Sequence, residues 1–478
     1  MTKPLTMHNS KLYSILEYFD KYEQNKLRKF LLSPYFNKNQ TLVDLFEYLI
    51  DKINKESTKG LEKEAIWNAA QAGKKYDDVR YRKLCSELLK LIENFLAQEH
   101  YQANPLYQAT YLLEAVSRKK MDKLFNSSIK TARRLSKQQP YKPGNFYFYQ
   151  YQVEKSYQEL SEHEYDRASK RNYENILENL DKFYLAEKLR YYCSMLSHEA
   201  VSSHKYEFLF KDAILKHLED DGYLETPPIS IYHQICMSQL EPKEEKYFFK
   251  LKDLAKESIE QFPPNEAEQI YGVASNYCIR KVNSGNQKFL QEYFEIYQEL
   301  INKELIYKDG ELSPYVFRNI IGFALRLGKY EWTKDFIENY NAKIPENLRE
   351  NAVSFNSASL YFYQKNYDKV IELLNTVEYE DFSYNLNSKT MLLATYYETD
   401  NLEPLESLME SFRAYLNRHK EIPENRRKSF ANLIKFVKKL TRIFPNDKKA
   451  IKKIKEEVEA DRNIASLKWL KEKIAELE

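Results

Sequence analysis

Two similar stretches follow one another between Tyr315 and Phe412, and this repetition limits the possible folds more than any other feature. Residues 327–331 (Leu-Gly-Lys-Tyr-Glu) align with residues 364–368 (Gln-Lys-Asn-Tyr-Asp) at a spacing of 37 residues. Self-similarity with a period of about 20 to 50 residues is typical of stacked repeats. After each aligned segment, apolar residues recur at helical intervals and form one stripe. One helix hairpin cannot cover its own stripe, so its stability must come from stacking on its neighbours.

The residues around these turns resemble those of the tetratricopeptide repeat family. In that family a Gly-x-Tyr-Asp/Glu type turn joins two helices, and a proline closes the second helix. The matching turn residues are Gly328, Tyr330, Glu331 and Pro345 in one stretch, and Tyr367 and Asp368 in the next. The small alanine of the family is replaced by Thr333, Val370 and Pro404, and the early Leu-Gly signature is missing.

The resemblance covers residues 315–412 and implies helix hairpins with a concave surface for a peptide or protein. Composition agrees, because 478 residues exceed one ordinary core and only 9 Gly and 15 Pro interrupt the helical pattern. We therefore predict an all-α protein, an irregular α-α solenoid of antiparallel helix hairpins with an N-terminal helical domain. Breaks near Pro140 and Pro445 predict three parts: an N-terminal domain (1–139), a tetratricopeptide-like solenoid (140–444) and C-terminal basic and capping helices (445–478).

An aromatic run and an apolar stripe give two local predictions. Residues 145–151 contain five aromatic side chains in succession or nearly so, which predicts a helix packed on both sides. Residues 424–458 predict one or two helices with Phe430, Leu433, Val437 and Phe444 on the inner stripe. The final segment has Leu467, Leu470, Ile474 and Leu477 on one side and is expected to cap the array.

The chain carries 74 basic and 71 acidic residues, so its formal charge of +3 does not imply a polyanionic partner for the whole molecule. Two segments are nonetheless strongly basic. Residues 425–455, called the basic ridge below, contain twelve Lys or Arg and one acid, Asp447. The predicted contacts with an anionic partner are Arg426, Arg427, Lys428, Lys435, Lys438, Lys439 and Arg442. The alternative is an ordinary solvated helix face.

The second basic segment spans residues 118–137. Its basic residues are Arg118, Lys119, Lys120, Lys123, Lys130, Arg133, Arg134 and Lys137, against the single acid Asp122. Both segments support a nucleic-acid-binding function as an alternative to protein binding.

No motif for catalysis, a cofactor or a metal is recognised, so we predict neither an enzyme nor a bound cofactor or metal. His198 and His204 are six residues apart and do not share one helix face unless the helix breaks between them. The four cysteines are widely spaced and indicate buried thiols in a reducing compartment. The sequence lacks a run of 18 apolar residues, which predicts a cytoplasmic protein without a membrane partner.

The predicted function is a non-catalytic scaffold or adaptor that binds a peptide or protein on a helical-repeat surface. The alternative is a helical-repeat protein that binds nucleic acid through the basic ridge at 425–455. The sequence gives no prediction of the oligomeric state.

Overall fold

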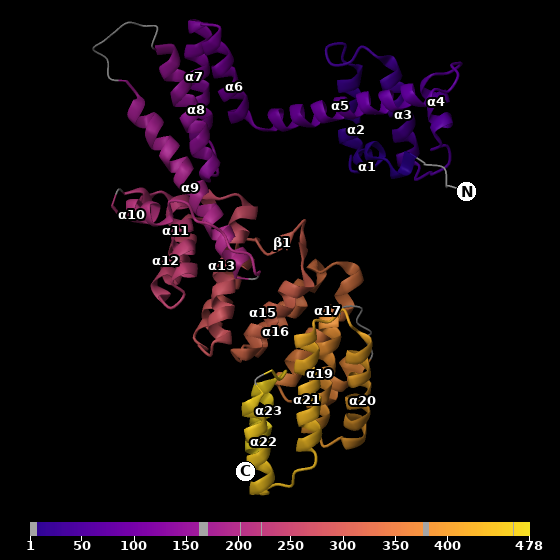
Figure 1. Cartoon of the computed structure of the whole chain (residues 1–478), viewed down its shortest axis with the longest axis vertical. Coiled ribbons are helices and arrows are strands. Elements are labelled where there is room, and N and C mark those ends of the chain that lie inside the picture. Colours follow the sequence, from indigo (N-terminus) through magenta and orange to yellow (C-terminus); the bar gives the residue numbers. More distant parts are fainter. Residues whose placement is uncertain (1–6, 162–170, 201, 221, 376–381, 462) are drawn as a thin grey trace. The chain divides into compact units, whose positions relative to one another are not determined.

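A computed structural model describes residues 7–161, 171–200, 202–220, 222–375, 382–461 and 463–478. It is 77% helical, with 23 α-helices in the described part and almost no sheet, which confirms the all-α prediction (Figure 1). The chain divides into two compact units, residues 1–188 and 189–478, and each is described by itself. The predicted domain boundaries near residues 139 and 444 stay predictions.

The first unit contains a short 3-10 helix and the helices of the N-terminal third of the chain. They are η1 (Met7–Asn9), α1 (Lys11–Glu17), α2 (Lys21–Leu32), α3 (Gln40–Asn54), α4 (Lys63–Ala70), α5 (Asp78–Ala103), α6 (Pro105–Arg118), α7 (Asp122–Lys137) and α8 (Gly144–Ser161). Helix α9 (Tyr173–Glu199) begins in this unit and ends in the next.

Two separate cores hold the first unit together. Helices α1 to α5 share one core, in which Phe46 and Trp67 are almost completely buried. Helices α6, α7 and α8 share another, built around Leu113, Phe125 and Val153. The long helix α5 contributes to the first core only as far as Phe95, so its last two turns lead out of that core toward α6.

The aromatic run on α8 contacts two neighbouring helices. Phe146, Tyr147, Phe148, Tyr149 and Tyr151 are all half-buried, and side chains of this run contact both α6 and α9, as expected of a helix packed on two sides. The rings pack on one another and on α9, where the ring centroids of Phe148 and Phe183 are 5.1 Å apart. On the α6 side, the ring centroids of Tyr149 and Tyr107 are 4.4 Å apart.

The second unit continues with helices and one very short hairpin of strands. Its elements are α10 (Lys211–Asp220), η2 (Tyr223–Glu225), α11 (Pro227–Leu240), α12 (Glu245–Ser258), η3 (Ile259–Gln261), α13 (Pro264–Asn283), α14 (Phe289–Asn302), β1 (Tyr307–Lys308), β2 (Glu311–Leu312), α15 (Pro314–Arg326), α16 (Tyr330–Tyr340), η4 (Asn341–Lys343), α17 (Glu346–Tyr363), α18 (Tyr367–Asn375), α19 (Phe382–Glu398), α20 (Leu402–Arg418), α21 (Glu424–Leu440), α22 (Lys448–Ala460) and α23 (Leu467–Glu476). The two strands pair antiparallel, with Tyr307 opposite Leu312.

Helices of the second unit pack against their neighbours in the sequence. Helix α11 packs on α12, α13 on α14, α17 on α18 and α19 on α20. In addition, α17 contacts both α15 and α19, so the first helices of successive hairpins also touch. This arrangement is compatible with a helical-repeat fold.

The first helix of four hairpins ends in the same way. A residue in the left-handed region follows α13, α15, α17 and α19, and these residues are Gly285, Gly328, Lys365 and Asp400. The next amide then donates to the carbonyl five residues earlier, as in Lys329 N to Ala324 O at 3.0 Å and Asn366 N to Tyr361 O at 2.9 Å. This is the Schellman motif, which satisfies the last carbonyls of a helix and turns the chain back. Tyr330 and Tyr367 are the first residues of the helices that follow, α16 and α18.

A proline cap is repeated at the start of α17 and α21. Residues 344–349 read Ile-Pro-Glu-Asn-Leu-Arg and residues 422–427 read Ile-Pro-Glu-Asn-Arg-Arg. Both isoleucines are buried, and Pro345 and Pro423 precede the first helical residue with an extended backbone. Since proline has no amide hydrogen and a fixed φ, it suits a position where a helix begins.

Candidate functional site: the basic ridge of the C-terminal helices

The basic ridge begins at the proline cap of α21, and the cap gives one of its arginines a structural contact. The Arg427 guanidinium donates to the carbonyl oxygen of Ile422 at 3.0 Å. Arg349 makes the same bond to Ile344 at 3.1 Å and also reaches the carbonyl of Ala342. Arg427 therefore holds the start of its own helix, and its predicted role as an anion contact stays a prediction.

The apolar stripe of α21 is buried, which fixes the direction of its basic residues. Leu433, Ile434 and Val437 are fully buried in a core shared with α20, α22 and α23. Phe444 was predicted on this stripe, but it is 80% exposed because α21 ends at Leu440 and the chain changes direction. Lys428 and Lys435 are exposed on the opposite side of the helix.

The basic side chains of the ridge differ in how far their charges are already neutralised. Lys439 forms an ion pair with Glu457 of α22. Arg426 lies 5.8 Å from the ring centroid of Phe382 and donates to Ser383 at 3.4 Å. Within the described part of the chain, no ion pair involves Lys428, Lys435, Lys438 or Arg442. These four cations remain available to a partner.

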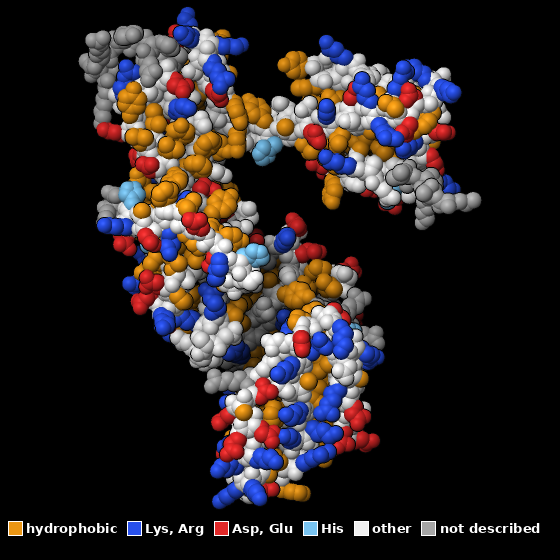
Figure 2. All heavy atoms as spheres, viewed as in Figure 1, with side chains coloured by type: hydrophobic (Ala, Val, Ile, Leu, Met, Phe, Trp, Pro, Cys, Tyr) orange, Lys and Arg blue, Asp and Glu red, His pale blue; other side chains and the backbone are white. Residues whose placement is uncertain are grey.

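Glu457 marks the place where the basic residues of two helices meet. Its pKa lies below its usual value, chiefly because Lys439 donates a hydrogen bond to the carboxylate, although partial burial acts in the other direction. The charges of Lys435 on α21 and Lys453 on α22 lower this pKa further. Figure 2 shows Lys and Arg side chains gathered over this part of the second unit, with acidic side chains near its margins.

Helix α23 covers the other end of this core. Leu470 and Ile474 are buried, whereas Leu467 and Leu477 are not fully covered. The ammonium group of Lys473 is also buried, 2.9 Å from Glu398 of α19 and 2.8 Å from Glu476. Burial alone would lower its pKa, but the hydrogen bonds to both carboxylates outweigh burial and raise it. Lys473 is thus a charged anchor between α23 and α19 rather than part of the basic ridge.

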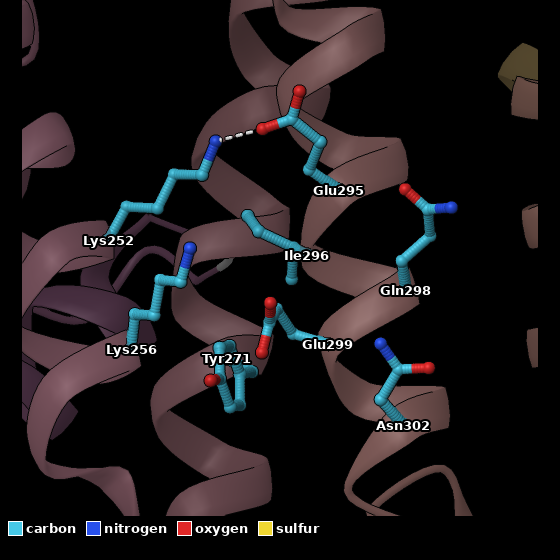
Figure 3. Close-up of a pocket in the computed structure, with 8 residues that line it drawn as sticks. All are labelled: Lys252, Lys256, Tyr271, Glu295, Ile296, Gln298, Glu299 and Asn302. Atoms are coloured by element: carbon cyan, nitrogen blue, oxygen red, sulfur yellow. Dashed lines mark hydrogen bonds and ion pairs between the residues drawn. The ribbon is translucent and has the colours of Figure 1, made fainter.

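A separate cleft of about 330 Å³ lies between α12, α13 and α14. Figure 3 shows Lys252 and Lys256 extending from α12, with Glu295 and Glu299 of α14 pointing toward them and Tyr271 of α13 below. Lys252 bonds to Glu295 and lies 2.6 Å from Glu292. Burial would lower the pKa of Lys252, yet these two hydrogen bonds raise it, so the amine stays protonated and is a poor nucleophile.

The Tyr271 side chain is the unusual feature of the cleft. It is only 4% exposed, and its hydroxyl has no hydrogen-bond partner among the described residues. Burial, together with the negative charges of Glu299 and Glu260, raises the pKa of Tyr271 to about 12. The hydroxyl therefore stays protonated at neutral pH. The cleft has polar groups that a small ligand could contact. On one side of it, Lys252 and its two glutamates already neutralise one another.

The two histidines separated in the sequence meet in space. Helix α9 ends at Glu199, and the ring centroids of His198 and His204 are 5.5 Å apart. The Tyr206 hydroxyl lies 2.7 Å from His198 Nδ1, and the Glu199 carboxylate accepts the backbone amide of Tyr206. In the described residues, no group of three His, Cys, Asp or Glu side chains is placed to hold a metal ion.

The cysteines are free thiols, of which Cys193, Cys236 and Cys278 are buried and Cys85 is half-buried. Burial raises the pKa values of Cys193 and Cys278, so both stay protonated. They fill space in the helical packing.

Comparison with protein-family models, curated proteins and solved structures found no match for this chain. None of the helices in the described residues combines the length and the apolar character that crossing a bilayer requires. The function must therefore be argued from the geometry of the surfaces.

Arg427 and Lys439 were predicted as contacts with an anionic partner, but the sequence did not reveal that each already has a partner within this protein. Ile422 is close to Arg427 in the sequence, and the nearly identical segment at 344–349 is a signal that could have suggested this contact. Glu457 is 18 residues from Lys439, and only the packing of α22 on α21 brings the two charges together.

Proposed function

We propose that this protein is a non-catalytic, cytoplasmic scaffold: an irregular, tetratricopeptide-like solenoid of antiparallel helix hairpins that binds another protein or a peptide. The observation that carries the proposal is the recurrence of one turn device at Gly285, Gly328, Lys365 and Asp400, at intervals of 43, 37 and 35 residues. A chain that turns back in the same way at regular intervals builds a long surface from equivalent helices, and such surfaces serve recognition in other repeat proteins.

Affinity capture with chemical cross-linking tests the scaffold proposal. The full-length chain serves as bait in a lysate of the source cells, and cross-linked residues are mapped by mass spectrometry. We expect a protein captured in near-equal amount, with cross-links to lysines of several successive hairpins. Capture of no protein above the level found with an unrelated helical bait would contradict the proposal.

Nucleic-acid binding is a second candidate, favoured by Lys428, Lys435, Lys438 and Arg442, four of the cations of the basic ridge that form no ion pair with a described residue. Lys428 and Lys435 are seven residues apart and lie on one side of α21, and Arg442 follows just beyond the end of this helix. Lys438 lies one turn from Lys435. Four phosphate contacts would make binding strongly salt-dependent.

A charge-reversal experiment separates the two candidates. The changes Lys428→Glu, Lys435→Glu, Lys438→Glu and Arg442→Glu are combined, which leaves Arg427 and Lys439 with their structural partners. The control reverses four exposed lysines of the first unit, Lys21, Lys38, Lys59 and Lys75. If the ridge binds phosphates, the ridge variant loses duplex DNA binding and its salt slope flattens by about 3 to 4 units, while the control keeps both. No binding by the parent at low salt would exclude the nucleic-acid candidate.

A further inference from the structure

A groove runs along the outer side of the α6–α7 hairpin in the first unit. Its volume is about 580 Å³. Helix α6 lines it with Pro105, Gln108, Ala109 and Leu112, and α7 lines it with Leu124, Ser127, Ser128, Thr131, Arg134 and Leu135. Another side of the hairpin packs on α8, and the lining residues Ala109 and Leu135 also contact the core of α6, α7 and α8. We call it the α6–α7 groove.

The groove is lined by apolar side chains and by short polar ones. The Ser127 and Ser128 hydroxyls both donate to the carbonyl of Leu124, and Thr131 donates to the carbonyl of Ser127. Their hydroxyls are therefore engaged with their own helix, and small side chains leave room at the middle. At one end Leu112 and Leu124 remain 44% and 42% exposed. These two leucines offer apolar surface to a ligand in the groove.

One edge of the groove is basic. Lys123, Ser127, Lys130, Arg134 and Lys137 follow at intervals of four, three, four and three residues, so they form one stripe along α7. Ser127 and Arg134 of this stripe line the groove itself, which places the three lysines directly beside it. All three lysines are exposed, and within the described residues they make no ion pair.

Two other cations of the hairpin are paired internally. Arg133 forms an ion pair with Glu154 of α8 at 3.0 Å, and Arg118 pairs with Glu114 on its own helix. The charge left beside the groove is therefore positive. Two exposed leucines beside a positive edge complement an amphipathic helix that has leucine-like side chains on one face and carboxylates beside them.

We propose that the α6–α7 groove binds an acidic amphipathic helix of a partner protein. This proposal rests on the scaffold function and names the chemistry of its partner. The apolar face of that helix covers Leu112 and Leu124, and its carboxylates pair with Lys123, Lys130 and Lys137. The lining residues of α7 extend over 12 residues, or roughly 16 Å of helix, which suits a partner helix of about three turns.

The test uses a designed, fluorescein-labelled helical peptide with leucines on one face and glutamates beside them. Its controls are a scrambled peptide of the same composition and a peptide with lysines in place of the glutamates. Fluorescence anisotropy with the full-length chain should show at least about tenfold tighter binding of the designed peptide than of either control. Equal binding of the scrambled peptide would overturn the proposal.

Two variants locate the binding. The double variant Leu112→Asp and Leu124→Asp should weaken peptide binding at least about tenfold, whereas the matched exposed leucine variant Leu402→Asp on α20 should not. The triple variant Lys123→Glu, Lys130→Glu and Lys137→Glu should weaken binding and reduce its dependence on salt. Circular dichroism verifies that each variant remains folded. Peptide binding unaffected by either groove variant would also overturn the proposal.

Other occupants give different outcomes. Sedimentation could show that the molecular mass doubles as the protein concentration rises. If the double leucine variant then has the mass of a single chain, a second copy of this protein occupies the groove. Oligonucleotide binding that depends on the three lysines but not on the leucines would identify nucleic acid. Either result overturns this proposal. If the peptide fails but capture finds a partner insensitive to the groove variants, the scaffold function stands without this groove.

Discussion

The starts of α17 and α21 have nearly the same sequence but different surroundings. Each has a buried isoleucine, a proline cap and an arginine that returns to the isoleucine carbonyl. At α17 the arginine is flanked by Leu348 and Glu350, and the helix contacts α15 and α19. At α21 the flanking residues are Arg426 and Lys428, and the helix contacts α20, α22 and α23. The shared cap therefore determines where each helix begins. The residues that flank the cap arginine differ in charge between the two helices.

The largest effect is expected where the α21 region differs most, at its buried lysine. Lys473→Ala should cost about 3 to 5 kcal/mol, because it leaves the carboxylate of Glu398 without its cation in the interior. Urea unfolding followed by circular dichroism measures the loss. Lys468→Ala, whose side chain is 94% exposed, is the matched control and should be close to neutral. Equal stability of both variants would remove α23 as an anchored cap.

Cavities in the two regions test whether their packing is equivalent. Leu374→Ala in α18 and Leu433→Ala in α21 each remove a buried leucine, so each should lower the unfolding free energy by about 2 to 5 kcal/mol. Thermal and urea unfolding give the values. If the Leu374→Ala variant were as stable as the parent, the apolar stripe of α18 would not be packed between helices.

The cap arginines provide the most direct comparison. Arg349→Ala should cost about 1 to 2 kcal/mol, because Arg349 bonds to two carbonyl groups, and Arg427→Ala should cost about 1 kcal/mol or less. Lysine at either position should recover little of the lost unfolding free energy, because its ammonium group cannot reproduce the geometry of the guanidinium hydrogen bonds. A neutral Arg427→Ala variant that weakens nucleic-acid binding would instead assign Arg427 to a ligand.

Substitutions at two turn residues in the left-handed region should change the unfolding free energy in opposite directions. Lys365→Gly should stabilise the chain by up to about 1 kcal/mol, because glycine adopts a φ of 58° without steric cost. Gly328→Ala should destabilise it by about 1 kcal/mol, through the backbone alone, since an added Cβ meets no atom within 4 Å. Differential scanning calorimetry measures both. Changes of the same sign would contradict the shared turn geometry.

The smallest expected effect is a pH dependence in the α21 region. The folded-state pKa of Glu457 lies below its ordinary value of 4.5, so its contribution to stability is present above that pH and is lost as the pH falls through the folded-state pKa. Unfolding free energies of the parent and of Glu457→Gln should therefore converge as the solution is acidified. A difference independent of pH would show that the ion pair with Lys439 is not formed in solution.

Sequence reasoning predicted the helical content and the turns more fully than the basic ridge. The interval between Gly328 and Lys365 was visible because turn residues and apolar stripes recur locally. The exposure of Phe444 was missed, since helical spacing was continued past the end of α21 at Leu440. Glu457, the partner of Lys439, is 18 residues away, and Glu398, one of the two partners of Lys473, is 75 residues away, where periodicity carries no information.

The sequence by itself determined that this protein is all-α and where several of its hairpins turn. These properties follow from local preferences: few glycines and prolines, apolar residues at helical intervals, and residues that adopt or tolerate a left-handed turn. Only the tertiary structure decided which charges remain available. Whether Lys435 is open to a partner while Lys439 is paired depends on how α22 packs against α21, and such a contact between distant residues is set by the burial of whole helix faces.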